Sequence, residues 1–227
     1  ANFDWSLVFN AGCTFAIRLQ TERGVKVNPQ FATLRAKDGV VDAFMDSQGR
    51  RPSIDTKQPE ITLTVLAGVK THTYSLDLSG DSLHRRGYRQ IMTEAPLKEN
   101  LAAAILRLAG WHNTNFDVLI DPMCGSGTFL IEALMMRTDR AAGLNRRFGF
   151  LGWAGHDASL WQQLKQEAEQ RHQIGLSQPL PRMYAYDADW NAVKATRHNL
   201  IAAGLEQALP RIQIEERTLA DWPDFAL

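Results

Sequence analysis

The residues of this chain that could do chemistry are concentrated in one segment, DPMCGSGTFLIEA at positions 121–133. It follows an apolar stretch at 116–120 and leads into a helical pattern. A strand, a glycine turn and a helix in that order are typical of a nucleotide-cofactor site at the edge of a parallel sheet. A P-loop would need a Lys after the glycines, and a dinucleotide fingerprint would need a small residue where Leu130 stands. An acidic strand end, a short Gly-x-Gly turn and a Thr favour S-adenosylmethionine instead.

The turn supplies six residues for which we expect cofactor contacts. The carboxylate of Asp121 could accept hydrogen bonds from the ammonium group of the cofactor, or it could simply cap the turn. The glycines would let the backbone approach the ligand closely, and the helix start offers N–H groups to the ligand carboxylate. The hydroxyls of Ser126 and Thr128 either contact the cofactor or cap the helix. The six positions are Asp121, Cys124, Gly125, Ser126, Gly127 and Thr128.

Further polar side chains follow two later strand patterns. Asp187 ends the stretch 183–187, where an acidic residue typically accepts hydrogen bonds from ribose hydroxyls; a solvated loop carboxylate is the alternative interpretation. Asp189 is a second ribose candidate or the cap of the next helix. After the third strand, either Thr218 or Asp221 could read the adenine amine, and the sequence leaves both open.

Alternating strand and helix patterns position these residues. We expect strands at 118–121 and 183–187 and from 212 onward, with helices from about Pro96, over 126–136 and over 191–203. This order predicts an α/β fold with an incomplete, doubly wound Rossmann-like sheet over residues 93–227. Leu97, Leu101, Ile105 and Leu108 form an apolar stripe on the first helix. Residues 138–180 are interpreted as an insert with a further helix, on which Leu160, Leu164 and Ala168 align.

Residues 1–80 predict a separate α+β unit, followed by a linker at 81–92. The pattern gives a strand at 14–19, a helix over 30–44 and a hairpin from 61–66 and 73–78. Gly49 supplies the helix stop. Apolar residues recur near helical spacing on this helix: Phe31, Leu34, Val40, Val41 and Phe44.

Two basic groups could contact RNA. Arg85, Arg86, Tyr88 and Arg89 offer three guanidinium groups for phosphate and one ring for stacking; a solvated linker with an interdomain salt bridge is the alternative. A second group lies near the cofactor turn, and RNA contact is slightly favoured there: Arg137, Arg140, Arg146 and Arg147. Three further side chains are interpreted as core of the insert: Trp153, His156 and Trp161.

Composition sets limits on these interpretations. The chain has 25 basic and 25 acidic residues, so a large autonomous RNA-binding surface is disfavoured, although local patches remain compatible with zero net charge. No apolar run approaches the length of a membrane span, and no Cys/His cluster has metal-ligand spacing. Cys13 and Cys124 are far apart, and we expect both to be free thiols in a reducing cytoplasm.

Several motifs resemble one known family. DPMCGSGTFLIEA is similar to motif I of the THUMP-containing methyltransferases that modify guanine N2 in RNA. The segment LSGDSLHRRGYR at 78–89 resembles the connection between the THUMP module and the catalytic domain, and EAPLKENL at 94–101 resembles the helix beside the cofactor. FLGWAGHD at 150–157 and LWQ at 160–162 resemble the insert of the bacterial 23S ribosomal RNA guanine-N2 methyltransferases. The similarity extends over nearly all 227 residues.

The resemblance implies a partial THUMP module at 1–80 and a methyltransferase that uses S-adenosylmethionine and acts on 23S ribosomal RNA. The family presents its target amine with an Asn-Pro-Pro-Tyr motif after the fourth strand, and this sequence contains no such motif. We therefore expect a fragment truncated at both ends, without catalytic residues of its own and inactive alone. A non-catalytic RNA-binding module that has lost its active site is the alternative, and a nicotinamide oxidoreductase is disfavoured by Leu130.

Overall fold

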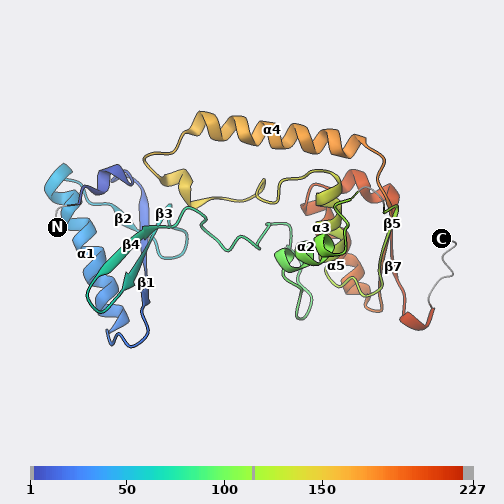
Figure 1. Ribbon diagram of the computed structural model, residues 1–227, viewed down its shortest axis with the longest axis horizontal. Helices are drawn as coiled ribbons and strands as arrows, with labels where there is room; N and C mark the ends of the chain where they lie inside the picture. Colours follow the sequence, from blue (N-terminus) through green and yellow to red (C-terminus); the bar gives the residue numbers. More distant parts are fainter. Residues whose placement is uncertain (1–2, 114–115, 222–227) are drawn as a thin grey trace. The chain divides into compact units, whose positions relative to one another are not determined.

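The computed structural model of the protein describes residues 3–113 and 116–221, which form two compact units. Unit 1 comprises Ala1–Ser82 and Arg147–Ser159, and unit 2 comprises Leu83–Arg146 and Leu160–Leu227. Figure 1 labels the main elements. The strands are β1 Thr14–Thr21, β2 Ser53–Ile54, β3 Ile61–Ala67, β4 His72–Leu76, β5 Val118–Asp121, β6 Arg182–Asp187 and β7 Ile212–Glu216. The α-helices are α1 Pro29–Gln48, α2 Glu99–Leu108, α3 Thr128–Arg137, α4 Ala158–Ser177 and α5 Trp190–Ala202. The 3-10 turns are Trp5–Leu7, Gly149–Gly152, Glu206–Arg211 and Leu219–Asp221.

Unit 1 is a four-stranded sheet with the long helix α1 beside it (Figure 1). The strand order is β2-β1-β3-β4, in which β1 is parallel to both of its neighbours and β3 and β4 form an antiparallel hairpin. The core joins Phe15 of β1 and Phe44 of α1 to Phe9. The expected strand, helix and hairpin are therefore present, and parallel pairing of β1 with β3 arranges them.

Helix α1 begins and ends at the residues that cap it. The side chain of Asn28 accepts a hydrogen bond from the Phe31 amide over 3.1 Å, and Gly49 closes the helix in the left-handed conformation at φ 64°. Val40, Val41 and Phe44 are buried as expected, but Phe31 and Leu34 are exposed. Because the core of unit 1 gathers around the second half of the helix, the apolar residues of its first turns remain at the surface.

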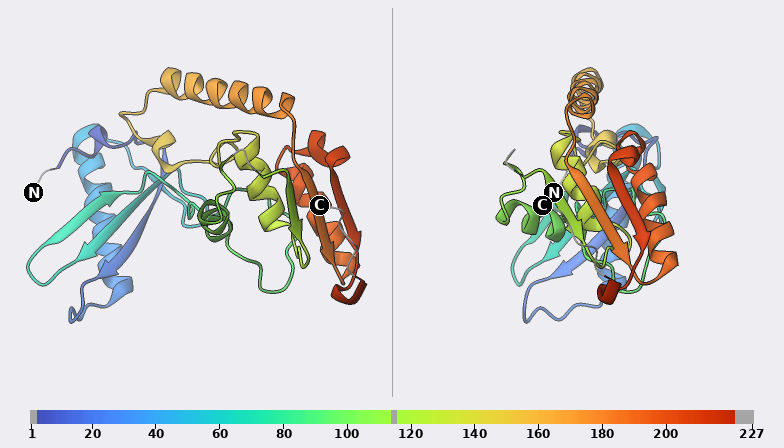
Figure 2. Two further views of the ribbon diagram at one scale, coloured as in Figure 1. Left: turned by 45° about the vertical axis from the view of Figure 1, so that its right-hand side comes forward. Right: turned by 90° about the vertical axis from the view of Figure 1, so that its right-hand side faces the viewer.

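Unit 2 contains a three-stranded, all-parallel sheet in the order β5-β6-β7, and Figure 2 shows its strands from two directions. Helix α3 follows β5 and α5 follows β6. Leu130, Ile131 and Leu134 of α3 are fully or almost fully buried against the strands, with Val193 and Leu200 of α5 in the same core. The predicted α/β fold is confirmed, since alternation of strand and helix is what a parallel sheet requires.

The apolar stripe expected on α2 lies mostly at the surface. Leu101, Ile105 and Leu108 are exposed, whereas Ala102 and Leu106 are buried. The helix packs on α3, and residues four apart share the face that meets it. Helix α4 differs in the same way, because Leu160 and Leu164 are exposed and its buried residues are His172 and Gly175.

Among the described helices, none combines the length and the apolar character that crossing a bilayer requires. Within the same residues, no group of three or more His, Cys, Asp and Glu side chains is arranged to hold a metal ion. Cys13 and Cys124 are free thiols, as expected.

Candidate functional site

The two predicted carboxylates lie at the same edge of the unit 2 sheet. Strands β5 and β6 are parallel, and Asp121 at the end of β5 pairs in register with Ala185, two residues before Asp187. The Gly125 amide donates to Oδ2 of Asp187 over 2.9 Å, and the Cys124 amide donates to the Tyr186 carbonyl over 2.8 Å. The glycine loop therefore folds across the ends of both strands.

The loop depends on glycine at its second Gly position. Gly127 has φ 81° and serves as the N-cap residue of α3. A Cβ added there would lie 2.9 Å from Cγ2 of Thr196 on α5, closer than carbon atoms normally approach. Both the backbone conformation and the neighbouring helix therefore require the absence of a side chain.

Asp121 is the electrostatically unusual member of the site. Its side chain is buried, and it accepts a hydrogen bond from the Met123 amide over 3.3 Å. Burial raises the pKa of Asp121 to about 6, and the negative charge of Asp187 contributes to the rise. A cation placed at this carboxylate would relieve both effects.

Cys124 lies inside the loop but faces protein. Its thiol is buried, and Thr196 Oγ1 approaches Sγ at 3.4 Å while it also donates to the Gly125 carbonyl over 3.0 Å. Burial raises the pKa of the Cys124 thiol to about 12, so the group is a neutral packing element at physiological pH.

The hydroxyls of Ser126 and Thr128 do not cap α3. The helix has no side-chain cap; instead, Arg89 donates to Ser126 Oγ over 3.1 Å and to Thr128 Oγ1 over 3.0 Å. Both hydroxyl residues are buried. Asp189, by contrast, caps α5 by accepting from the Asn191 amide over 2.8 Å.

The structure separates the four residues of the expected RNA-facing patch. Tyr88 is 2% exposed and donates from its hydroxyl to Glu132 over 3.1 Å, so its ring packs in the core of unit 2 and presents no stacking face. Arg86 pairs with Glu132 at 3.4 Å, and Arg89 pairs with Glu99 at 3.1 Å. Arg85 is exposed. Of the four, Arg85 is the one that could meet a phosphate without rearrangement.

The second basic group is also used internally in part. Arg137 Nη2 donates to the Phe116 carbonyl and its guanidinium lies 4.6 Å from the ring centroid of Trp111. Arg146 Nη1 donates to the carbonyl of Arg85 over 2.6 Å, and Arg147 is an exposed residue of unit 1. RNA contact by this group stays a prediction.

The expected adenine-reading residues lie together. Thr218 Oγ1 donates to Oδ2 of Asp221 over 2.7 Å, and both residues are exposed just after β7. The Arg217 amide donates to the Asp187 carbonyl over 2.8 Å, which brings this segment to the end of β6. The choice between Thr218 and Asp221 stays open.

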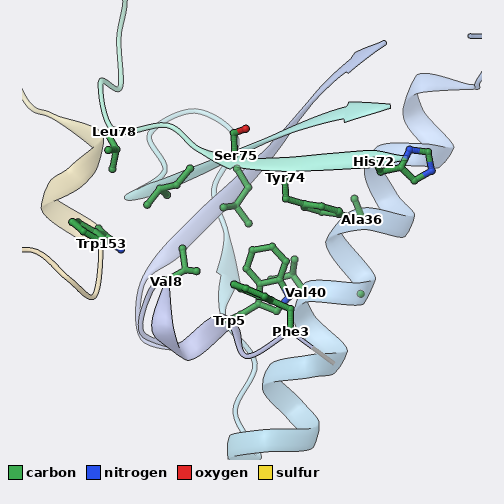
Figure 3. Close-up of a pocket in the computed structure, with 13 residues that line it drawn as sticks. Phe3, Trp5, Val8, Ala36, Val40, His72, Tyr74, Ser75, Leu78 and Trp153 are labelled. Atoms are coloured by element: carbon green, nitrogen blue, oxygen red, sulfur yellow. The ribbon is translucent and has the colours of Figure 1, made fainter. Parts of the chain in front are cut away.

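An apolar hollow of about 790 Å³ lies elsewhere, within unit 1 (Figure 3). Trp5, Val40, Tyr74 and Trp153 are among the residues that line it. Trp153 is thus partly exposed at this hollow, while His156 packs near the ring of Phe150 at 5.4 Å. Because the hollow contains no grouped carboxylates and no glycine turn, we place the candidate chemistry at the strand ends of unit 2.

The buried polar residues that bond to the glycine loop were not identified from the sequence. Thr196 and Asn199 of α5 are 0% exposed, and both bond to carbonyls of the glycine loop. Their spacing of three places them on one helix face together with the buried Val193 and Leu200. Polar residues on an otherwise buried helix face are the signal that could have identified them.

Comparisons with known proteins agree with this geometry. Residues 86–222 match the family profile described as RMKL-like, methyltransferase domain, and residues 1–67 match the THUMP domain. The chain is 70% identical over 224 residues to the "Ribosomal RNA large subunit methyltransferase K/L" of Acinetobacter baumannii (strain AYE). That alignment covers 99% of this chain and 30% of the relative, so the chain spans less than a third of the relative's length.

Two solved structures share the fold. One is a predicted N6-adenine-specific DNA methylase from Listeria monocytogenes str. 4b F2365, with a TM-score of 0.78 and 28% identity over 97% of this chain and 56% of that chain. The other is SMU.472, a putative methyltransferase complexed with SAH, with a TM-score of 0.77 and 30% identity over 99% of this chain and 57% of that chain. The chain belongs to the RMKL-like methyltransferase family, with a THUMP domain at its N-terminal side.

Proposed function

We propose that unit 2 binds S-adenosylmethionine at the carboxyl ends of β5 and β6. We further propose that the chain is the cofactor-binding part of an RNA methyltransferase. The hydrogen bond from the Gly125 amide to Asp187 carries this proposal, because it sets the glycine loop and the second carboxylate side by side. The buried carboxylate of Asp121, with its raised pKa, adds a place for a cation. The SMU.472 structure, complexed with SAH, supports the choice of ligand.

Each group at the edge has a role that fits part of the cofactor. Asp121 would pair with the ammonium group, and the first-turn amides of α3 would face the carboxylate. Asp187 would accept from the ribose hydroxyls with the lone pairs that its two backbone partners, Gly125 and Asp189, leave over. Ser126 and Thr128 would donate hydrogen bonds from their hydroxyls to the cofactor. Cys124 and the two glycines would line the cofactor pocket. The bound cofactor supplies an electrophilic methyl group, and the residues of this chain bind and orient it.

For the substrate, we propose the exocyclic N2 of a guanine in 23S ribosomal RNA, modified in the cytoplasm. The motif resemblance, the THUMP match and the name of the Acinetobacter relative support an RNA of the large subunit. Two alternative hypotheses predict a different outcome for the RNA. An adenine N6 target would follow the description of the Listeria structure, and a non-catalytic RNA-binding module would bind RNA without methyl transfer.

The chain contains no Asn-Pro-Pro-Tyr motif, so we propose that residues 1–227 bind the cofactor without methylating RNA by themselves. Detection of N2-methylguanine after incubation of the purified chain with RNA and labelled cofactor would overturn this. A chain of the relatives' full length should form N2-methylguanine in unmodified 23S RNA, whereas N6-methyladenine as the product would contradict the proposed target.

Calorimetric titration of the chain with S-adenosylmethionine tests the cofactor proposal. We expect measurable binding to the wild-type chain and at least about tenfold weaker binding to Asp187→Ala, because the ribose partner and the Gly125 hydrogen bond are both lost. Absence of binding by a chain whose circular dichroism shows it to be folded would contradict the proposal for these residues.

For RNA, we propose Arg85 as the contact in the connecting segment, since its side chain is exposed. Arg85→Glu should weaken binding of a large-subunit RNA fragment and reduce the slope of log affinity against log salt by about one. Thermal stability should stay unchanged. Unaltered RNA affinity at low salt would remove Arg85 from the interface.

A further inference from the structure

We propose that Arg89 is a positioning residue for the cofactor loop, which it holds in its binding conformation before the ligand arrives. From the sequence, this guanidinium could either contact RNA or form a salt bridge in a solvated linker. The structure instead turns it towards the glycine loop and buries it, with 10% of its side chain exposed. The inference rests on the proposed cofactor site. It assigns a role in that site to a residue outside the glycine loop.

The guanidinium of Arg89 joins three segments of unit 2. Nη1 donates to Ser126 Oγ over 3.1 Å, and Nη2 donates both to Thr128 Oγ1 over 3.0 Å and to the Leu97 carbonyl over 2.7 Å. Nε donates to Glu99 Oε1 over 3.1 Å. The planar fork of an arginine can serve these four acceptors at once, whereas the compact ammonium of a lysine cannot.

These hydrogen bonds also fix the direction of the loop hydroxyls. A guanidinium only donates, so Ser126 and Thr128 must accept from it, and their own hydrogens must point elsewhere. Both hydroxyls are thereby available as donors at the start of α3, where the helix amides also favour negative charge. Arg89 therefore prepares this end of the loop for the carboxylate of the ligand.

The charge of Arg89 is balanced within the same cluster. Glu99 is the first residue of α2, and 8% of its side chain is exposed. A buried charge without a partner would be strongly unfavourable, and the ion pair offsets part of that cost. Because Arg89 also bonds to the loop hydroxyls, the ion pair connects the start of α2 to the glycine loop.

Asn199 of α5 also joins the segment that follows Arg89 to the glycine loop. Its Oδ1 accepts from the amides of Gln90 and Ile91 over 2.9 and 3.0 Å. Its Nδ2 donates to the carbonyls of Ile91 and Ser126 over 2.9 and 3.1 Å. The fully buried side-chain amide of Asn199 thus connects two segments to α5: the residues that follow Arg89, and the glycine loop. The same segment brings Thr93 Oγ1 to 3.7 Å from where a Cβ on Gly125 would lie.

A loop fixed in this way loses little conformational freedom when it binds its ligand. Loosening it should weaken binding even when the overall fold is intact. We therefore expect Arg89→Lys to lower the affinity for S-adenosylhomocysteine by about tenfold or more, which corresponds to about 1.4 kcal/mol. The effect should appear at temperatures where the variant is fully folded.

Arg86→Lys is the matched control. Arg86 comes from the same segment and is also paired with a buried carboxylate, Glu132, but its hydrogen bonds go to Glu132 and to the Leu83 carbonyl and to no residue of the loop. Calorimetric titration with S-adenosylhomocysteine and urea unfolding would be measured for the wild type and both variants. Weaker binding by Arg89→Lys than by Arg86→Lys at comparable stability supports the positioning role, and equal affinities overturn it.

Hydrogen exchange of the ligand-free chain separates this inference from the cofactor proposal. Arg89→Lys should speed exchange in the peptide that covers 121–131 more than in peptides from β6 or β7, and Thr128→Val, which deletes one acceptor while preserving shape, should do so to a smaller extent. If the wild-type chain binds no S-adenosylhomocysteine, the cofactor proposal fails and exchange still decides whether Arg89 orders the loop. Unchanged loop exchange in both variants would overturn the inference. Should Arg89→Lys fail to fold, Thr128→Val alone decides it.

Discussion

The backbone amide of Gly125 donates a hydrogen bond to Oδ2 of Asp187 over 2.9 Å. This contact joins the turn after β5 to the carboxylate at the end of β6, so two parts of the site that are far apart in sequence form one structural unit. Asp187 also accepts from the Asp189 amide through Oδ1 over 3.0 Å. A change in Asp187 should therefore affect both the proposed ribose contact and the conformation of the glycine loop.

Asp187→Asn tests both consequences, and a control variant of similar stability separates them. The amide oxygen can accept from Gly125 or from Asp189, but its NH₂ group cannot accept from the other, so stability should fall by about 1 kcal/mol. Affinity for S-adenosylhomocysteine should fall by about tenfold or more, because one acceptor and the negative charge are lost. Asp189→Ala, which removes the α5 cap at a similar loss of stability, serves as the calorimetric control. Equal loss of affinity in both variants would contradict a direct role for Asp187.

Asp121 should make the stability of the chain depend on pH. Burial raises its pKa from 3.8 to about 6 in the folded state, so the folded chain holds this proton more tightly than the unfolded chain does. Stability from this group is therefore highest below pH 4, falls as the pH rises from about 4 to about 6, and stays low above that. The rise in pKa corresponds to a loss of about 3 kcal/mol at most.

Asp121→Asn removes that titration and should make the ligand-free chain more stable than the wild type above pH 6. Below pH 4 the two chains should be equally stable, because both carry a neutral side chain there. Urea unfolding from pH 4 to pH 7.5 measures the difference, which should grow between pH 4 and pH 6 and then level off. A difference that is independent of pH would show that the buried charge of Asp121 is not destabilising. The same variant should lose cofactor binding.

Much of the fold follows from patterns that act over short distances. The strand β5, the glycine turn and α3 were predictable because the apolar run, the glycines and the helical spacing occur together in 116–137. Gly49, which has a positive φ, was equally predictable as a helix stop. Asp121 and Asp187 could be paired because parallel strands bring their carboxyl ends to one edge.

The partners of the basic residues could not be predicted in this way. Arg86, Tyr88 and Arg89 look like an exposed basic and aromatic cluster in sequence. Their acceptors, Glu132 and Glu99, lie 10 to 46 positions away and reach them only through packing of α2 and α3. The exposed stripe on α2 has the same origin, since an apolar stripe alone does not show which face meets a neighbour.

Tyr88→Phe tests whether Tyr88 is a core residue. The hydroxyl donates to Glu132, whose pKa is raised by burial and which needs its donors. Deleting the hydroxyl should destabilise the chain by about 1–3 kcal/mol, because a buried carboxylate then lacks one hydrogen bond. A solvent-facing tyrosine in a linker would lose almost nothing on the same change. Chemical denaturation measures the difference, and a loss below about 0.5 kcal/mol would place the ring at the surface.

Gly127→Ala should abolish cofactor binding while leaving unit 1 folded. The positive φ of 81° alone costs about 1–3 kcal/mol for a residue with a Cβ, and that Cβ would also press on Cγ2 of Thr196 at 2.9 Å. Gly49→Ala is the matched control, since its φ is 64° and its Cβ would meet nothing within 4 Å. It should lose stability from the backbone alone and bind S-adenosylhomocysteine normally. Adding Thr196→Ser to Gly127→Ala removes Cγ2 but keeps the hydroxyl, so the double variant should regain part of the stability. If it regains none, the crowding at Thr196 is not what requires glycine at position 127.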